Sequence, residues 1–235
     1  MILRAAYDRP VAVIGDIHGR IDHLDRLLAR LGDVPIVVCG DLCDRGPDTR
    51  AVIDRLIERG AVGVRGNHDE WLIAWAGGEG FDTMALNPMM SGEATLRSYG
   101  VIKQTAREIE AEAWRVPTAH RDWLRGLAIV ADLEVQGSRW WVIHAGISPS
   151  IDLAGVAVDG VVPHLAVHHR ASLLWSATDP EMALPVDRPV IMGHVPQRRP
   201  RDHGHCLAID AGCGTTRDGY LAAVVLPERR FVDSR

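Results

Sequence analysis

Four apolar runs, each followed directly by a glycine-containing polar motif, constrain the fold of this chain most strongly. The runs are rich in β-branched residues and cover residues 11–14, 36–39, 61–65 and 140–143. Short apolar runs of this kind are typical of buried strands. Open α/β sheets bind their ligands at the C-terminal ends of such strands, so we expect the polar motifs to converge on one edge. They read Gly15-Asp16-Ile17-His18-Gly19, Gly40-Asp41-Leu42-Cys43-Asp44-Arg45-Gly46, Gly66-Asn67-His68-Asp69 and His144-Ala145-Gly146.

The spacing of the first three motifs predicts two strand–helix–strand units. Asp16 and Asp41 are 25 residues apart, and Asp41 and Asn67 are 26 residues apart. This length suits a crossover helix between parallel strands. Apolar residues at helical intervals predict helices over residues 21–31 and 48–59, each followed by a glycine. The first third of the chain therefore predicts an α/β fold.

The rest of the chain predicts two further parts. Residues 70–125 combine helix-forming residues with glycine and proline breaks, and predict a helical insertion beside the sheet. Trp71 and Trp75 are expected to fill the core, with a place in the substrate cleft as the alternative. Beyond the insertion the apolar runs predict strands only, among them a hairpin that turns at Gln136-Gly137. No repeat or linker is evident, so we expect a single domain over residues 1–235.

Composition limits the classes of function. The chain has 26 Lys and Arg against 31 Asp and Glu, so its net charge of −5 gives no support for general nucleic-acid binding. No apolar run approaches the roughly 20 residues that span a bilayer. Residues 1–10 carry Arg4, Asp8 and Arg9, unlike a signal peptide, and we expect a cytoplasmic protein without a membrane partner.

The cysteines agree with a reducing compartment. Cys39, Cys43, Cys206 and Cys213 form no CxxC pair, so reduced and mostly buried thiols are expected. Cys43 lies between Asp41 and Asp44, and the expectation for it is a small space-filling side chain. The alternative is an oxidisable thiol beside a metal site.

The motif set resembles the phosphoprotein phosphatase type of calcineurin-like metallophosphoesterase. The signature of that family is GDxHG, GDxxDRG, GNHE or GNHD, a HAG-type histidine and a GH-type histidine. The last block is Gly193-His194, which follows a strand-like run over residues 189–192, and all five blocks occur in the family's order. The resemblance implies a β-sandwich of two mixed sheets flanked by helices. It also implies two divalent metal ions, with Mn²⁺ expected and Fe, Zn and Co left open.

The resemblance assigns roles to individual residues. Asp41 would bridge the two metals, which neutralise the phosphate charge and supply a metal-bound hydroxide as the nucleophile. The other metal ligands would be Asp16 and His18 on one metal and Asn67, His144 and His194 on the other. His68 would be the general acid, oriented by Asp44. The alternative, that these residues only form turns and caps, suits one motif but not five in order.

Two arginines are candidates for binding the phosphate. Arg45 would grip the phosphate oxygens, because a guanidinium matches them bidentately. Arg65 could assist, or could only support its loop. Many relatives carry a further phosphate-binding arginine after a Leu-x-Trp segment, but here Ala177 and Thr178 follow Leu173-Leu174-Trp175-Ser176. Arg170 and Arg198 are the candidates to replace it. The remaining histidines, at positions 23, 120, 164, 168, 169, 203 and 205, are expected at the surface or in loops.

Three functions are compatible with these residues. The expected function is a serine/threonine protein phosphatase, since residues 92–101 and 209–212 are similar to segments of bacterial relatives of that kind. The alternative is a symmetrical bis(5'-nucleosyl)-tetraphosphatase, suggested by Asp69 and by Trp71 and Trp75 as stacking partners for adenine. The third is a non-catalytic binding module, which the intact ligand set disfavours. The expected partner is thus a phosphorylated protein or a dinucleoside polyphosphate.

Overall fold

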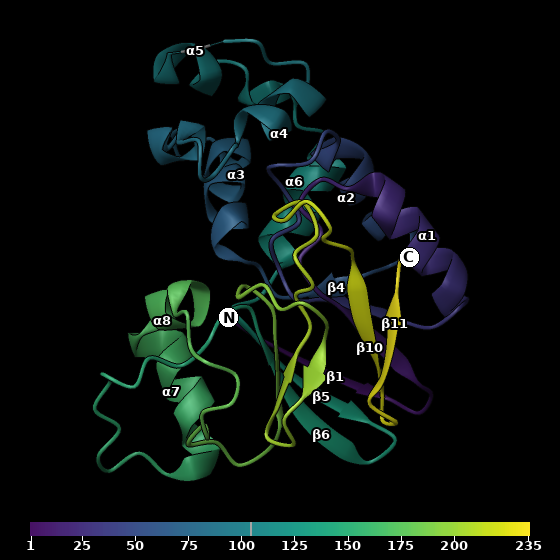
Figure 1. The fold of residues 1–235 in the computed structure, drawn as a ribbon. Helices are drawn as coiled ribbons and strands as arrows, with labels where there is room; N and C mark the ends of the chain where they lie inside the picture. The colour runs from purple at the N-terminus through teal and green to yellow at the C-terminus, as the bar shows by residue number, and fades with distance from the viewer. Residues whose placement is uncertain (104) are drawn as a thin grey trace.

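Two mixed β-sheets packed face to face form the centre of the computed structural model, which describes residues 1–103 and 105–235 (Figure 1). One sheet has the order β11-β10-β2-β3-β4, and the other has the order β1-β5-β6-β7-β9-β8. The strands are β1 Ile2–Tyr7, β2 Val11–Ile14, β3 Ile36–Val38, β4 Val62–Gly63, β5 Val130–Val135, β6 Ser138–Ile143, β7 Val190–Met192, β8 Arg201–Asp202, β9 Cys206–Ala208, β10 Ala222–Leu226 and β11 Arg230–Asp233. Each sheet combines parallel and antiparallel pairs, which confirms the predicted fold class.

The middle strands of the two sheets are buried on both faces, and their sequences explain why. In β2, Val11 and Val13 face the other sheet, whereas Ala12 and Ile14 face the helices. In β6, Trp140 and Val142 likewise lie between the sheets. Because side chains alternate across a strand, a strand covered on both faces needs a continuous apolar run. Three of the four runs recognised in the sequence therefore mark the central strands β2, β3 and β6, whereas the run over residues 61–65 contains the edge strand β4.

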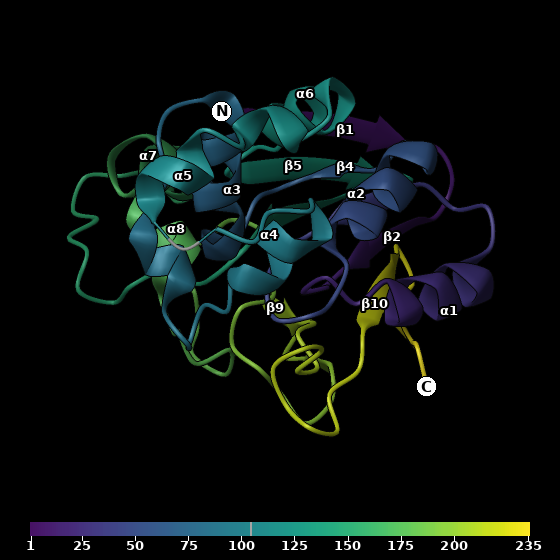
Figure 2. The same cartoon turned by 90° about the horizontal axis from the view of Figure 1, so that it is seen from above.

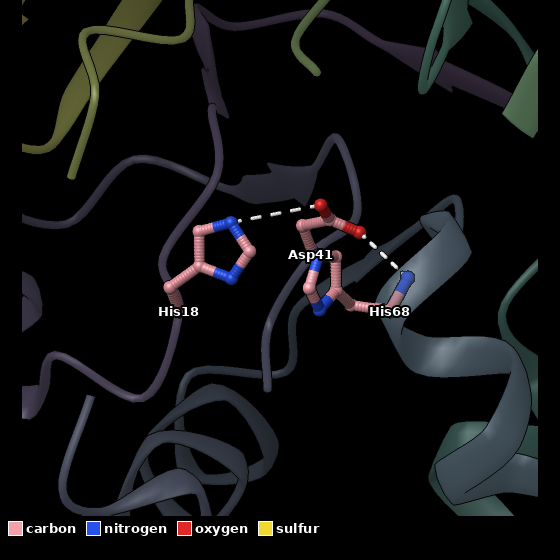
Figure 3. A group of neighbouring side chains, drawn as sticks. All are labelled: His18, Asp41 and His68. Atoms are coloured by element: carbon pink, nitrogen blue, oxygen red, sulfur yellow. Dashed lines mark hydrogen bonds and ion pairs between the residues drawn. The ribbon is translucent and has the colours of Figure 1, made fainter. Parts of the chain in front are cut away.

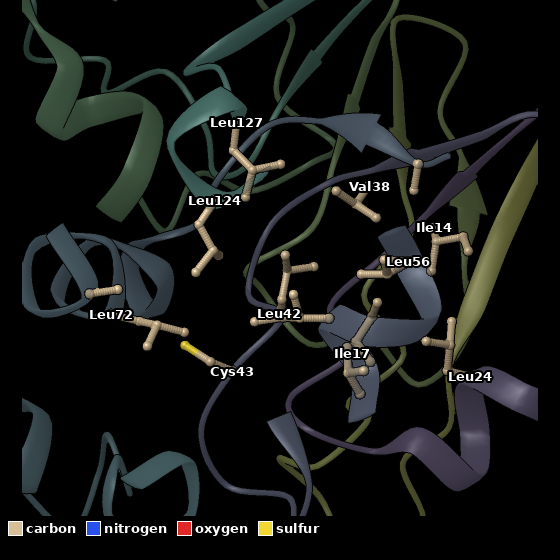
Figure 4. Close-up of a cluster of buried hydrophobic side chains, with 14 of the residues drawn as sticks. Ile14, Ile17, Leu24, Val38, Leu42, Cys43, Leu56, Leu72, Leu124 and Leu127 are labelled. Atoms are coloured by element: carbon tan, nitrogen blue, oxygen red, sulfur yellow. The ribbon is translucent and has the colours of Figure 1, made fainter. Parts of the chain in front are cut away.

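Two predicted helices cover the outer face of the first sheet. They are α1, Ile21–Leu31, and α2, Thr49–Glu58. Leu24 and Leu27 of α1 are buried against the sheet, and Asp48 caps α2 by accepting a 2.9 Å hydrogen bond from the Ala51 N–H. Figure 4 shows side chains from these helices, the sheet and the neighbouring loops in one apolar cluster.

Residues 67–103 and 105–126 contain several short helices, most of which lie beyond one end of the sheets (Figure 1) and in front of the strands when seen from above (Figure 2). These are α3 Asn67–Gly77, η1 Thr83–Leu86, α4 Glu93–Ser98, α5 Ala106–Glu110, η2 Ala113–Arg115 and α6 Thr118–Gly126. Trp71 and Trp75 of α3 are 5% and 1% exposed, so both lie in the core, as expected. This burial removes them as stacking surfaces for a base. The assignment of the whole chain to a single domain stays a prediction.

The expectation that only strands follow the insertion is wrong. A 3₁₀ turn, η3 Val158–Gly160, leads into α7 Val161–His168 and α8 Arg170–Trp175, which cover the outer face of the second sheet (Figure 1). Their buried residues Val161, Leu165, Leu173 and Leu174 pack on that sheet. Such short apolar stretches cannot be assigned to helix or strand by periodicity alone. In the described part of the chain, no helix is long and apolar enough to cross a membrane.

Candidate metal centre and active site

The five motifs occupy loops that follow β2, β3, β6 and β7, together with the start of α3, and these loops bond to one another. The His18 N–H donates to the Asp41 carbonyl, the Gly193 N–H to the His144 carbonyl, and the His68 N–H to Asp41 Oδ1. The polar residues predicted to converge are therefore brought together at one edge of the sandwich.

Backbone strain is concentrated in these loops. Among the described residues, five motif residues other than glycine have φ between 48° and 70°: His18, Asp41, Asp44, Arg45 and His194. A residue with a Cβ costs roughly 1–2 kcal/mol in this left-handed conformation. Such strain persists only where the surrounding structure enforces it, and it is typical of functional sites.

Asp41 is the centre of the site. Its Oδ2 lies 3.6 Å from His18 Nε2, and its Oδ1 lies 3.4 Å from His144 Nε2. Figure 3 shows the His18 ring facing one carboxylate oxygen, while the other oxygen accepts from the His68 backbone. Burial disfavours the charge, but His144, His68 and His18 together lower the pKa of Asp41 below its ordinary value. The carboxylate thus presents one oxygen to each of two histidines.

Both of these histidines are fixed in the same tautomer. His18 Nδ1 donates to the Cys43 carbonyl and His144 Nδ1 to the Cys39 carbonyl, each at 2.9 Å. Because a carbonyl can only accept, the proton of the neutral ring lies on Nδ1. Burial lowers the pKa of both rings, to about 3 for His18, and so favours their neutral form. Each therefore presents the lone pair of Nε2 to Asp41, which is the arrangement of a metal ligand.

The surroundings of His144 provide a test of whether a cation fits. Asn67 Oδ1 lies 3.0 Å from His144 Nε2, and Asp41 Oδ1 lies 3.4 Å from the same nitrogen. All three atoms are acceptors once Nδ1 carries the ring proton, so no hydrogen bond can join them. Converging lone pairs of oxygen and nitrogen are what a divalent cation requires. The donor set therefore fits a metal ion at this position.

Among the residues that the structure describes, two groups could each hold a metal ion, and Asp41 belongs to both. One group is His18, Asp41 and His68, and the other is Asp41, His144 and His194, with the ligand atoms of each group within 4.8 Å of one another. The shared carboxylate is in the position required of a bridge. The assignment of individual ligands stays a prediction, because Asp16 lies outside both groups and His68 was assigned a different role.

Asp16 is held beside these groups by backbone contacts. Its carboxylate accepts from the His194 N–H at 3.2 Å, and a Cβ on Gly193 would lie 2.1 Å from its Oδ1. Burial, followed by the charges of Asp210 and Asp41, raises the pKa of Asp16 well above its ordinary value. Sequence reasoning missed Asp210, which is 2% exposed and whose pKa burial raises to about 6. Asp16, Asp41 and Asp210 are thus three buried carboxylates, and the described residues do not place a separate cationic side chain beside each of them. This is a further argument for bound cations.

The predicted acid pair is assembled. His68 Nδ1 donates to Asp44 Oδ2 at 2.7 Å, and both side chains are buried. Burial alone would lower the pKa of His68, but the charges of Asp41 and Asp44 raise it above the ordinary value. The ring also meets His18 edge to face, with 4.8 Å between ring centroids. His68 is thus placed beside the metal ligands with its Nε2 free of the Asp44 contact.

The two predicted phosphate-binding arginines have different surroundings. Arg45 reaches into the site, where its guanidinium lies 2.6 Å from His18 Nε2 and 3.1 Å from His68 Nε2. Arg65 instead donates to the Leu127 carbonyl and to Glu70, contacts that suit a support for its loop. Arg170 pairs with the same Glu70 from α8. Binding of phosphate by Arg45 or Arg65 stays a prediction.

Asp69 and Cys43 of the motifs, and His120 outside them, have structural roles. Asp69 accepts from the backbone N–H groups of Leu42 and Gly66 at 2.9 and 2.8 Å, so it joins two motif loops and does not face a substrate. Cys43 is fully buried in the cluster of Figure 4, and burial raises its pKa well above the ordinary value, which supports a space-filling role. His120 is 1% exposed between Tyr99 and Asp54, so its expected surface position is wrong.

This geometry agrees with the comparison with known families. The family model described as calcineurin-like phosphoesterase matches residues 9–220. The chain belongs to this family. This family includes phosphoesterases that use divalent metal ions, and the described residues include two groups that could hold such ions.

Relatives of this calcineurin-like phosphoesterase differ in substrate. The symmetrical bis(5'-nucleosyl)-tetraphosphatase of Acidovorax sp. is 34% identical over 144 residues, which cover 58% of this chain and 43% of the relative. The chain therefore spans less than half the length of that relative. The asymmetrical tetraphosphatase PrpE of Oceanobacillus iheyensis is 24% identical over 94% of this chain and 90% of its own. Serine/threonine-protein phosphatase 1 of Salmonella typhimurium is 36% identical over 92 residues, 37% of each chain.

A solved structure of a candidate diadenosine tetraphosphatase has the same fold. Its TM-score is 0.61, with 20% identity over 99% of this chain and 96% of the other. At this identity the likeness concerns the fold alone. The comparisons thus establish the family and the fold, and the relatives include proteins named as dinucleoside tetraphosphatases and one named as a protein phosphatase.

Proposed function

We propose that this phosphoesterase removes phosphate from serine and threonine side chains of proteins. The observation that carries the proposal is the buried Asp44–His68 pair, whose Nδ1–Oδ2 distance is 2.7 Å. A serine or threonine alkoxide is a very poor leaving group and needs a proton as the P–O bond breaks. The phosphate leaving group of a dinucleoside polyphosphate is a much weaker base, so it depends less on an acid.

The residues of the chain divide the work of such a reaction. Asp41, Asp16, His18, Asn67, His144 and His194 would hold two divalent ions, most naturally Mn²⁺ for this oxygen and nitrogen set. Two such ions neutralise phosphate charge and lower the pKa of water. Arg45 would bind two phosphate oxygens, since its guanidinium already lies beside His18 and His68. As Arg45 turns from His68 Nε2 to the phosphate, His68 in its protonated form would donate the proton on Nε2 to the departing oxygen while Asp44 holds Nδ1.

A second function, hydrolysis of dinucleoside tetraphosphates, is favoured by a different observation. The alignment with the asymmetrical tetraphosphatase covers 94% of this chain and 90% of the relative, so regions outside the metal motifs also correspond. The match to the serine/threonine phosphatase covers only 37% of each chain. Because Trp71 and Trp75 are buried, an adenine would need another stacking partner. Trp175 is the candidate, since it is 53% exposed at the end of α8 and belongs to the Leu-x-Trp segment after which many relatives carry a phosphate-binding arginine.

Initial rates distinguish the two functions. With Mn²⁺ present, kcat/KM would be measured on a panel of phosphoserine and phosphothreonine peptides and on diadenosine tetraphosphate at matched concentrations. A much higher value on the peptides supports the proposal, and a much higher value on the dinucleotide refutes it in favour of the second function. The nucleotide products then separate symmetrical cleavage, which gives only ADP, from asymmetrical cleavage, which gives AMP and ATP. The Arg198→Ala variant would also be assayed on the peptide substrates, because the exposed arginines that follow His194 suit acidic peptides.

A further inference from the structure

The Asp44 carboxylate receives hydrogen bonds from two side chains that the mechanism above does not use. Thr95 Oγ1 donates to Asp44 Oδ1 at 2.8 Å, and Trp71 Nε1 donates to Asp44 Oδ2 at 3.0 Å. His68 Nδ1 is the third donor, at 2.7 Å. Thr95, Asp44 and His68 are 0–2% exposed and Trp71 is 5% exposed, so water does not compete for these bonds.

The protons of this network can be assigned from donor and acceptor capacity. The Thr95 hydroxyl has one proton, and the Asp44 carboxylate is its acceptor. Its two lone pairs then accept from the Asp44 N–H at 2.8 Å and from the Thr49 hydroxyl at 2.9 Å. The hydroxyl is therefore fully used, and it contacts the main chain and the side chain of Asp44 at once.

This double contact matters because Asp44 is held in an unfavourable conformation. Its φ is 70°, a left-handed value that a residue with a Cβ rarely adopts. Thr95 fixes the backbone N–H of this residue, and Thr95 and Trp71 each fix one of its two carboxylate oxygens. Without them the carboxylate would be free to rotate, and His68 would lose the partner that sets the direction of its ring.

The two donors come from a part of the chain separate from the metal loops. Trp71 lies on α3, one turn after His68, and Thr95 lies on α4, which packs against α2. Both belong to the helical segment at one end of the sheets (Figure 1). That segment thus reaches the acid pair by two hydrogen bonds, although it supplies no predicted metal ligand beyond its first turn.

We propose that Thr95 and Trp71 are positioning residues for proton donation: they hold the Asp44 carboxylate so that His68 keeps Nε2 directed at the leaving group. This inference rests on the proposed role of His68 as the general acid. It predicts that losing either donor slows only those reactions whose leaving group needs a proton.

The test compares leaving groups in the metal-loaded enzyme. In Thr95→Val the side chain keeps its shape and loses the hydroxyl, and in Thr95→Ser the hydroxyl is kept. We expect kcat of Thr95→Val on phenyl phosphate to fall about 10–100-fold, within the range that a general acid contributes. On 2,4-dinitrophenyl phosphate, whose leaving group needs no proton, we expect less than about a 3-fold change. KM and the content of both metals should stay near wild type, and Thr95→Ser should restore the rate on phenyl phosphate.

Ser98→Ala is the matched control, because Ser98 lies on α4 and bonds the Thr95 carbonyl without touching Asp44. It should leave both rates unchanged. Trp71→Phe removes the N–H donor while it keeps an aromatic ring in the core, and it provides the same test if Thr95→Val does not fold. Equal losses on both substrates, or lost metal, would overturn the inference in favour of a purely structural role. His68→Asn separates this from failure of the proposed function: if His68→Asn itself shows no leaving-group dependence, His68 is not the acid and the function proposal fails.

Discussion

Replacing Gly193 with alanine perturbs the predicted metal centre through a single contact. The new Cβ would lie 2.1 Å from Asp16 Oδ1, whereas ordinary contact begins at 3.4 Å. Asp16 is 2% exposed, and its carboxylate accepts from the His194 N–H. It therefore cannot turn into solvent, and the carboxylate must shift by about 1 Å. A misplacement of this size costs on the order of 10²-fold in rate.

We expect Gly193→Ala to keep its fold, to bind Mn²⁺ more weakly at one site and to lose about 10²-fold in kcat. Calorimetric titration of chelator-treated protein with Mn²⁺, followed by rate measurements, tests this. Gly126→Ala is the control, because a Cβ at that helix end would meet nothing within 4 Å. Wild-type Mn²⁺ affinity and full kcat in folded Gly193→Ala would refute the placement of Asp16 beside the metals.

Three further predictions test other parts of the site. Asp41→Asn should lose both bound metal, measured by elemental analysis, and activity; full occupancy of two sites would show that Asp41 is not the bridge. His68→Asn should keep its metals and lose roughly 10²–10⁴-fold in kcat on a poor leaving group, and an unchanged rate would exclude it as the acid. Burial raises the pKa of Asp210 from 3.8 to about 6, so the metal-free folded state binds more protons than the unfolded state between these values. Its contribution to stability should fall by about 2 kcal/mol as pH rises from 4 to 6. Urea unfolding in chelator should show Asp210→Asn gaining stability over wild type across that range, and a constant difference would contradict it.

The parts of the fold that the sequence predicted well share one property. Residues 21–31 and 48–59 have apolar residues at helical intervals, and the runs before each motif are continuous and rich in β-branched residues, so in both cases the local pattern itself indicates burial. Residues 161–175 carry equally apolar side chains in pieces too short for a period to be read. Their helical state depends on packing against the second sheet, which no local pattern contains.

The residues of the candidate site also fall into two groups, those that the sequence predicted and those that only the folded structure reveals. Asp16, Asp41, His68 and His194 were found because each belongs to a motif at a strand end. Thr95 and Asp210 were missed as site residues. Thr95 bonds to Asp44, which is 51 residues away in the chain, and Asp210 lies near Asp16, which is 194 residues away. Only the folded structure brings such pairs together. The surroundings of Arg65 also depend on a distant residue, the carbonyl of Leu127.

Anomalous diffraction from crystals grown with Mn²⁺ would show directly whether Asp41 bridges two metal ions. We expect two anomalous peaks about 3.5–4 Å apart, one beside His18 and one beside His144, with an Asp41 oxygen bonded to each. A single peak, or two peaks that do not share Asp41, would contradict the bridged two-metal centre on which the proposed chemistry depends.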